Sequence, residues 1–198
     1  MGEKSIQKRK FIIDKARAVF AEKGFKNVTM KDIVDACGIS RGGLYLYFSS
    51  TEELFLEVLS NDVSEDDEEA ILAAIHGNSS AGDMLALFLK EQKKEILRKK
   101  NNLTFATYEF FSMHKVPASD NPLKKQFDTA VRIVEKLIEN GVDSEEFYCE
   151  DPLGAARNLM YVVEGLKVTS GTIGITEEAV DKELMFALEG LVPDELNN

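Results

Sequence analysis

The sequence predicts an all-α protein of about nine helices, with a small N-terminal domain followed by a larger helical domain. Apolar residues recur at steps of three and four along almost the whole chain, which is the period of an amphipathic helix. No stretch alternates apolar and polar residues between turn dipeptides, as a half-buried strand would. Capping residues and glycines also divide the chain into segments, so each apolar stripe has a defined beginning and end.

The first helix is expected over residues 4–23. Ile12, Ala16 and Phe20 lie at i, i+4 and i+8 and form one apolar stripe. Gly24 follows the last periodic residue, and we expect it to adopt the left-handed conformation that ends many helices.

The second and third expected helices are short. Thr29 and Asp32 have the spacing of a capping box, which predicts the start of the second helix. Gly38 is expected to end the second helix in the left-handed conformation and to form the turn at a place where a side chain would clash, and Ser40 caps a third helix over residues 41–48. Two short helices joined by a tight glycine turn, after a longer supporting helix, make a helix-turn-helix, whose second helix enters the major groove of DNA.

A fourth helix is expected to start at a second capping box, Ser50 with Glu53, and to continue past Leu59. We expect the first domain to cover residues 1–50 and the second to cover residues 51–198. The remaining helices are expected over residues 82–100, 103–114, 122–141, 152–170 and 176–191.

The net charge of −11 seems at first to argue against binding to DNA. The charge is divided unequally, however, with +5 on residues 1–48 and −16 on residues 49–198. A small basic head on an acidic body suits a protein that contacts phosphates with one end only.

Several other classes of protein and site are disfavoured. Cys37 and Cys149 lie far apart without a CxxC pair, so we expect neither a disulfide framework nor a zinc site, and a reducing cytoplasm fits best. No run of 18 apolar residues and no apolar leader segment is present, so neither a membrane partner nor secretion is expected. The chain has only two histidines and no recognisable catalytic spacing, so we expect no enzyme and no cofactor.

Residues 11–59 resemble the DNA-binding domain of the TetR family of transcription regulators. The resemblance is carried by the segments 18–20 with 24–25, 28–33, 38–48 and 52–54. It implies a homodimeric regulator that represses transcription from a palindromic DNA operator and is released by a small-molecule effector, whose identity the sequence does not give. Activation instead of repression, and DNA binding without a ligand, remain alternatives.

The resemblance also implies roles for individual residues. Thr29, Ser40 and Tyr47 match positions that hold phosphates. The groove-facing positions of the recognition helix correspond to Arg41, Gly42, Gly43 and Tyr45. The fork of Arg41 matches O6 and N7 of guanine, with a phosphate contact as the alternative, and Tyr45 is either part of the core or free to reach DNA.

Two positions depart from the family pattern. Leu46 replaces a common aromatic residue and could touch a thymine methyl group. Thr51 replaces a common lysine and so removes one phosphate contact. Lys31 is expected to compensate, together with Lys26 and the N-terminal basic residues Lys8, Arg9 and Lys10.

The larger domain is expected, from the resemblance, to bind the effector and to dimerise. Its aromatic residues could line a pocket, although aromatic residues at helical spacing more often form packed core. The candidates for contact with a ligand are Phe88, Phe105, Tyr108, Phe111 and Phe127. Glu109 and His114 could orient a polar ligand or could be surface groups, and they offer too few ligands for a metal. The apolar faces of residues 152–170 and 176–191 are expected to form the dimer interface.

Overall fold

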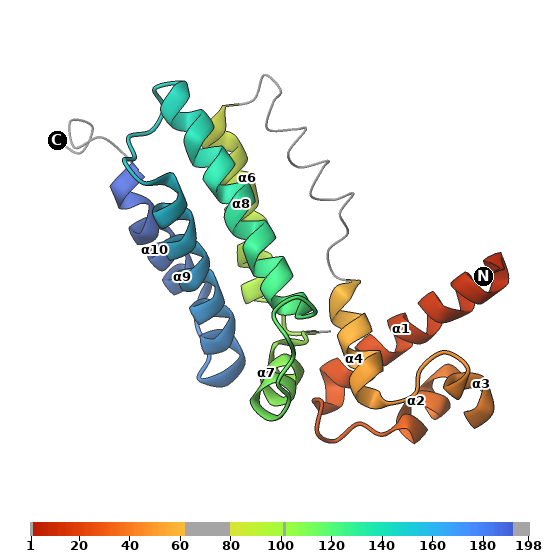
Figure 1. Cartoon of the computed structure of the whole chain (residues 1–198). Helices are drawn as coiled ribbons and strands as arrows, with labels where there is room; N and C mark the ends of the chain where they lie inside the picture. The colour runs from red at the N-terminus through yellow and green to blue at the C-terminus, as the bar shows by residue number, and fades with distance from the viewer. Residues whose placement is uncertain (1, 62–79, 101, 192–198) are drawn as a thin grey trace. The chain divides into compact units, whose positions relative to one another are not determined.

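The computed structural model describes residues 2–61, 80–100 and 102–191, and over these residues the chain is helical with no strand. This confirms the all-α fold class (Figure 1). The chain divides into two compact units, one formed by Met1–Asp62 with Lys99–Leu123 and the other by Val63–Arg98 with Lys124–Asn198. None of the described helices is both long enough and apolar enough to cross a lipid bilayer.

The first unit is built around the long helix α1, which packs against α2, α4 and α7. Its helices are α1 (Glu3–Lys23), α2 (Met30–Cys37), α3 (Arg41–Tyr45), α4 (Thr51–Ser60) and α7 (Thr104–Met113). Phenylalanine rings fill the centre of this core, where the ring centroids of Phe20 and Phe55 are 4.8 Å apart and those of Phe25 and Phe110 are 4.9 Å apart. The expected apolar stripe of α1 is therefore the side that this helix buries.

The left-handed conformation expected of Gly38 is confirmed, but the other expectations for the glycines that end α1 and α2 are wrong. Gly38 is left-handed, with φ 62° and ψ 35°, but an added Cβ would meet no atom within 4 Å. Its backbone torsion therefore requires glycine, and the expected steric clash is wrong. Gly24 has φ 74° and ψ 169°, an extended conformation with positive φ that is open essentially only to glycine, and not the left-handed helical one we expected. A Cβ at Gly24 would also lie 2.6 Å from Oε2 of Glu109.

Helix α3 is shorter than predicted, since it ends at Tyr45 and not at Phe48. The backbone then tightens, and the amide of Tyr47 donates to the carbonyl of Leu44 over 2.9 Å. Two consecutive glycines inside the helix, at positions 42 and 43, lower its propensity to continue. Phe48 nevertheless reaches the core, where it is almost fully buried.

The second unit is a bundle whose helix axes are roughly aligned, with consecutive helices running in opposite directions (Figure 1). It contains α6 (Ala81–Ile96), most of α8 (Pro122–Asp143), α9 (Pro152–Thr172), α10 (Glu177–Leu188) and the short 3-10 helix η1 (Glu189–Leu191). Helix α9 packs against both α6 and α10. The bundle core is aliphatic and includes the almost fully buried Leu137, Leu159 and Val163.

Two helix ends in this unit correct the sequence prediction. Helix α6 ends at Ile96, before the predicted residue 100. Helix α8 does not end at Gly141, because it continues to Asp143. Gly141 is instead a packing site, since an added Cβ would lie 2.1 Å from the ring of Phe147.

Candidate nucleic-acid interface

The start of α2 is a complete capping box. The amide of Thr29 donates to Oδ2 of Asp32 over 2.8 Å, and the amide of Asp32 donates to Oγ1 of Thr29 over 3.4 Å. Lys23 donates to the same carboxylate over 2.6 Å. The bonds from Lys23 and Thr29 hold the pKa of Asp32 well below its usual range, so this helix end already carries a fixed negative charge beside an ammonium group.

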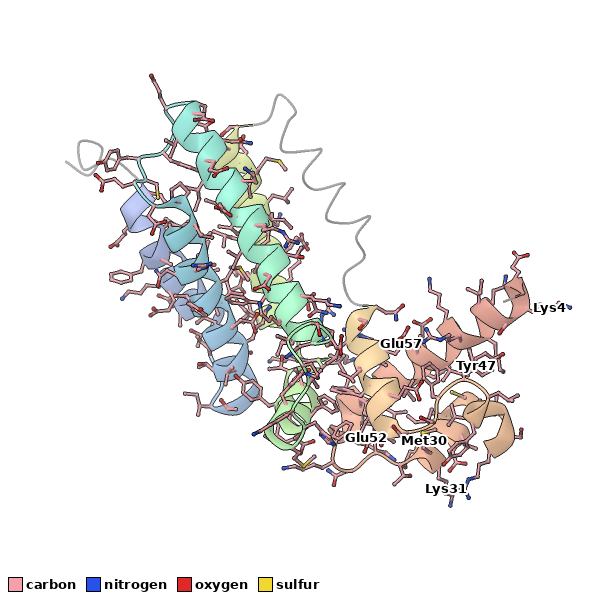
Figure 2. The ribbon with its side chains drawn as sticks, in the orientation of Figure 1. Lys4, Met30, Lys31, Tyr47, Glu52 and Glu57 are labelled. Atoms are coloured by element: carbon pink, nitrogen blue, oxygen red, sulfur yellow. The ribbon has the colours of Figure 1, made fainter. Side chains whose placement is uncertain are left out.

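The hydroxyl of Thr29 is engaged inside this box, where it donates to Oδ2 of Asp32 over 2.5 Å. A phosphate at this helix end would therefore be met first by the backbone amides of the first turn, and by the exposed side chain of Lys31. Figure 2 shows Lys31 extending from α2 away from the rest of the unit.

Helix α3 is held by one cap and one buried anchor. The amide of Gly43 donates to Oγ of Ser40 over 3.1 Å, which leaves the hydroxyl proton of Ser40 able to donate elsewhere. Leu44 is fully buried and fixes the inner face of the helix.

The outer face of α3 is open. Tyr45 is 43% exposed and Leu46 is 84% exposed, so Tyr45 belongs to the surface and not to the core. The guanidinium carbon of Arg41 lies 5.5 Å from the centre of the Tyr45 ring, a distance typical of a cation–π contact. An added Cβ at Gly42 would meet nothing within 4 Å, so the backbone here is accessible to a large partner. Tyr47 is half-buried and packs against the core of the unit.

The start of α4 is acidic. Ser50 caps the helix by accepting from the amide of Glu53 over 3.2 Å, as expected. The carboxylate of Glu53, however, accepts from the amide and hydroxyl of Ser49 at 2.7 and 2.6 Å, and not from the amide of Ser50. These bonds from Ser49 lower the pKa of Glu53 and keep it ionised. Glu52 lies in the same first turn, so the start of α4 attracts phosphates less than it would with a lysine at position 51.

Arg9 has a role that the sequence reasoning missed. We expected it to contact phosphate, but its guanidinium pairs with the carboxylate of Glu57 in α4 and lies over the ring of Phe48 at 5.0 Å. The two side chains stand 48 residues apart in the sequence, so no local spacing indicates the pair.

The five aromatic candidates for ligand contact are divided between the two units. Phe105 and Tyr108 are exposed on α7, with the half-buried Phe111, in the first unit. Phe88 and Phe127 pack at the edge of the second core, and the ring of Phe127 stacks on that of Tyr161 at 5.2 Å.

The two polar candidates near these aromatic residues have partners within the first unit. The carboxylate of Glu109 accepts from the amide of Lys26 over 3.1 Å, and the ring of His114 stacks on Phe110 at 4.6 Å. Over the described parts of the chain, no group of three or more His, Cys, Asp or Glu side chains is placed to hold a metal ion.

Two short capped helices, α2 and α3, share the first unit with α1, α4 and α7, and the second unit is a helical bundle. This arrangement defines a helix-turn-helix DNA-binding regulator. Residues 12–58 match the family of bacterial regulatory proteins called the tetR family, and residues 84–181 match the tetracyclin repressor-like C-terminal domain. The chain belongs to the TetR family of transcription regulators.

Individual relatives agree with this assignment. An uncharacterized HTH-type transcriptional regulator of Bacillus subtilis, YfiR, is 32% identical over 143 residues, which cover 72% of this chain and 69% of the relative. The HTH-type transcriptional repressor AcnR of Corynebacterium efficiens is 35% identical over 63 residues, which cover 32% of this chain and 34% of AcnR. The crystal structure of a TetR/AcrR-family regulator from Thermobifida fusca is 25% identical, with a TM-score of 0.71, and the match covers 93% of this chain and 98% of that one.

Proposed function

We propose that the protein is a homodimeric transcription repressor that binds a palindromic operator through α3 and its flanking residues, and that a small molecule releases it. The single observation that carries this proposal is the outer face of α3, where Arg41, Tyr45 and Leu46 are exposed while Leu44 anchors the helix from inside. In this proposal, residues 1–50 bind DNA, and residues 51–198 bind the effector and form the dimer.

The base-reading residues lie on that outer face. Arg41 donates two bonds to O6 and N7 of a guanine, and its stacking on Tyr45 orients the guanidinium plane before DNA arrives. Leu46 contacts a thymine methyl group, since its exposed aliphatic side chain suits no polar partner. A phosphate contact by Arg41 is the alternative.

Other residues position the protein on the sugar–phosphate backbone. Ser40 donates its free hydroxyl proton to a phosphate, and Lys31 supplies a charge from the start of α2. The remaining proposed contacts are the amides that follow Thr29, the hydroxyl of Tyr47, and the close backbone approach at Gly42 and Gly43.

The apolar faces of α9 and α10 that we expected at the dimer interface are buried in the core of their own unit, as for Leu159, Val163 and Leu184. A dimer is supported instead by other apolar side chains that are left exposed on these two helices. Tyr161, Met185 and Phe186 are 64%, 66% and 69% exposed, more than a lone bundle would leave open on adjacent helices. A five-residue recognition helix also supplies too little contact for specific affinity by itself. Two such helices about 34–36 Å apart, or a multiple of that, read a palindrome together.

Repression and release remain the finer parts of the proposal. AcnR is named a repressor, and repression is therefore the first expectation for this chain. A ligand releases the operator only if it binds the released state more tightly than the DNA-bound state. Activation, or DNA binding without any ligand, is the second candidate. A protein that acts on operator DNA works in the cytoplasm, and we propose that location.

One experiment tests the core of the proposal. The purified protein selects sequences from random double-stranded DNA, and the selection is repeated with a panel of metabolites. A palindromic consensus whose affinity falls with one metabolite supports the proposal, and binding without sequence preference contradicts it.

Arg41→Glu then tests the reading helix. We expect operator affinity to fall at least a hundredfold, because the variant loses a bidentate base contact and reverses a charge beside DNA. Sedimentation should show an unchanged dimer. Lys90→Glu, an equal change of charge at an exposed position of α6, should leave affinity unaltered. Unchanged binding by Arg41→Glu would contradict the proposal.

A further inference from the structure

Helix α1 carries an exposed face that lies outside the helix-turn-helix itself. Lys4, Lys8, Phe11 and Lys15 lie at i, i+4, i+7 and i+11, so they share one side of the helix. The buried stripe of α1 lies about a third of a turn away from them. Lys4, Gln7, Lys8 and Phe11 line a shallow groove on this side, and Figure 2 shows Lys4 at the N-terminal end of α1.

The ammonium groups of this stripe are held in place but not neutralised. The nitrogens of Lys8 and Lys15 lie 5.1 and 5.8 Å from the centre of the Phe11 ring, so one aromatic side chain holds both charges near it. Within the part of the chain that the structure describes, none of the three lysines has a carboxylate partner. The contrast lies on the same helix, where Arg9 pairs with Glu57 and Lys23 pairs with Asp32.

This face lies close to the turn of the helix-turn-helix. The charges of Lys8 and Lys15 both act on the thiol of Cys37, the last residue of α2, which directly precedes the turn glycine Gly38. Burial has the larger effect and raises the pKa of that thiol. The stripe therefore lies on a helix that packs directly against α2, the first helix of the helix-turn-helix.

We propose that Lys4, Lys8 and Lys15, ordered by Phe11, bind phosphates of the DNA backbone beside the segment that α3 reads. The inference rests on the proposed function and extends the DNA contact to α1. Ammonium groups on flexible stems suit phosphate oxygens as point charges, and they read no bases. The stripe therefore sets affinity and its dependence on salt, while α3 sets sequence preference.

The test compares a lysine of the stripe with an exposed lysine of another helix. Lys8→Gln removes a charge from the stripe, and Lys90→Gln removes the same charge from an exposed position of α6. Operator and scrambled duplexes are titrated by fluorescence anisotropy at several salt concentrations. Each lost phosphate contact lowers the slope of log K against log salt by about 0.9 per head.

We expect Lys8→Gln to weaken binding to operator and scrambled DNA by the same factor and to flatten the salt dependence, with Lys90→Gln close to the wild type. Combining Lys4→Gln, Lys8→Gln and Lys15→Gln should lower the slope by about 3 per head. All these positions lie at the helix surface, so circular dichroism should show unchanged folding.

The outcomes separate this inference from the proposed function. If Lys8→Gln behaves like Lys90→Gln while Arg41→Glu still abolishes operator binding, the proposed α1 contact is wrong and the proposed regulator function still stands. If Lys8→Gln changes the affinity for the operator alone, the stripe reads sequence and the phosphate assignment is wrong. If Arg41→Glu has no effect either, it is the proposed function that fails.

Discussion

Arg9 in α1 and Glu57 in α4 form an ion pair directly beside the ring of Phe48, the residue at which the chain leaves the recognition segment. Side-chain exposure is 33% for Arg9 and 29% for Glu57, so water screens the pair only in part. The bond that Arg9 donates lowers the pKa of Glu57, and the same bond raises the pKa of Arg9, so both stay charged. The pair therefore links α1 to α4, and it also contacts Phe48, which lies between α3 and α4.

A double-mutant cycle on Arg9→Met and Glu57→Gln should give a coupling energy of about 1 kcal/mol, at the upper end for a partly exposed pair. Arg9→Met keeps most of the aliphatic stem, so the cycle measures mainly the charge pair. The free energy of unfolding is measured in urea for the wild type, both single variants and the double variant.

The exposed pair Lys136–Glu139 provides the control, with an expected coupling of about 0.3 kcal/mol. Simple addition of the two single effects at Arg9 and Glu57 would show that the pair makes no contribution of its own.

Local chemistry allowed much of the fold to be predicted. Thr29, Ser40 and Ser50 each cap the helix that they were expected to cap, because a hydroxyl bonds to an amide only three residues later. Asp151 and Thr176 cap α9 and α10 at the same spacing, each by accepting from the amide three residues later. Helix starts are thus decided within four residues of sequence.

The misses share a different cause, which is contact across long stretches of chain. We expected Arg9 to be a free cation, but the folded chain places Glu57 beside it. We expected Gly141 to end a helix, but the ring of Phe147 packs against it. The end of α3 depends on how Leu44 and Phe48 pack into a core that is formed mainly by other helices. Which of the candidate contacts meet DNA depends on a partner that the sequence does not contain.

Gly141→Ala should destabilise the second unit by about 1–3 kcal/mol, the usual cost of overpacking a well-filled core. The added methyl group would lie 2.1 Å from the Phe147 ring, and the ring is held by the backbone bond from its own amide to the carbonyl of Gly141 over 2.9 Å. Thermal unfolding followed by circular dichroism measures the loss.

Gly171→Ala is the matched control, because it adds the same group in α9 where no atom lies within 4 Å. Alanine there should stabilise the helix slightly, by up to about 1 kcal/mol. Equal melting temperatures for the two variants would contradict the packing role of Gly141.

Gly38→Ala should destabilise the first unit by about 1–2 kcal/mol, because a left-handed backbone is strained for any residue with a Cβ. Space is not the cause, since the site is open. Gly38→Asn should recover part of the loss, since asparagine tolerates this conformation better than alanine does. Urea unfolding of the three proteins ranks them, and an asparagine variant no better than alanine would show that torsion is not the determinant.

Glu146 should make the stability of the second unit dependent on pH under acidic conditions. Its carboxylate accepts from the hydroxyl of Ser80 over 2.6 Å and from the amides of Gly82 and Ala81 over 3.0 and 3.1 Å, which closes the start of α6 from 64 to 66 residues away. These bonds lower the pKa of Glu146 from 4.5 to about 2. A group with a lowered pKa in the folded state contributes stability above its unfolded value and loses it as pH falls toward the folded one. Glu146→Gln should therefore lower the melting temperature most above pH about 5, and the difference from the wild type should narrow as the pH falls from 4.5 toward 2.

The neighbouring Glu145→Gln is the control for this effect, because the side chain of Glu145 makes no hydrogen bond within the described residues. It removes the same charge from the same loop, so it should shift the melting temperature little at any pH. The measurement is a set of thermal unfolding curves for the three proteins across the acidic range. If the ionised carboxylate stabilises the start of α6, its protonation in the wild type must reproduce the loss of charge in the variant. A difference in melting temperature between Glu146→Gln and the wild type that stays constant or widens on acidification would therefore contradict this role.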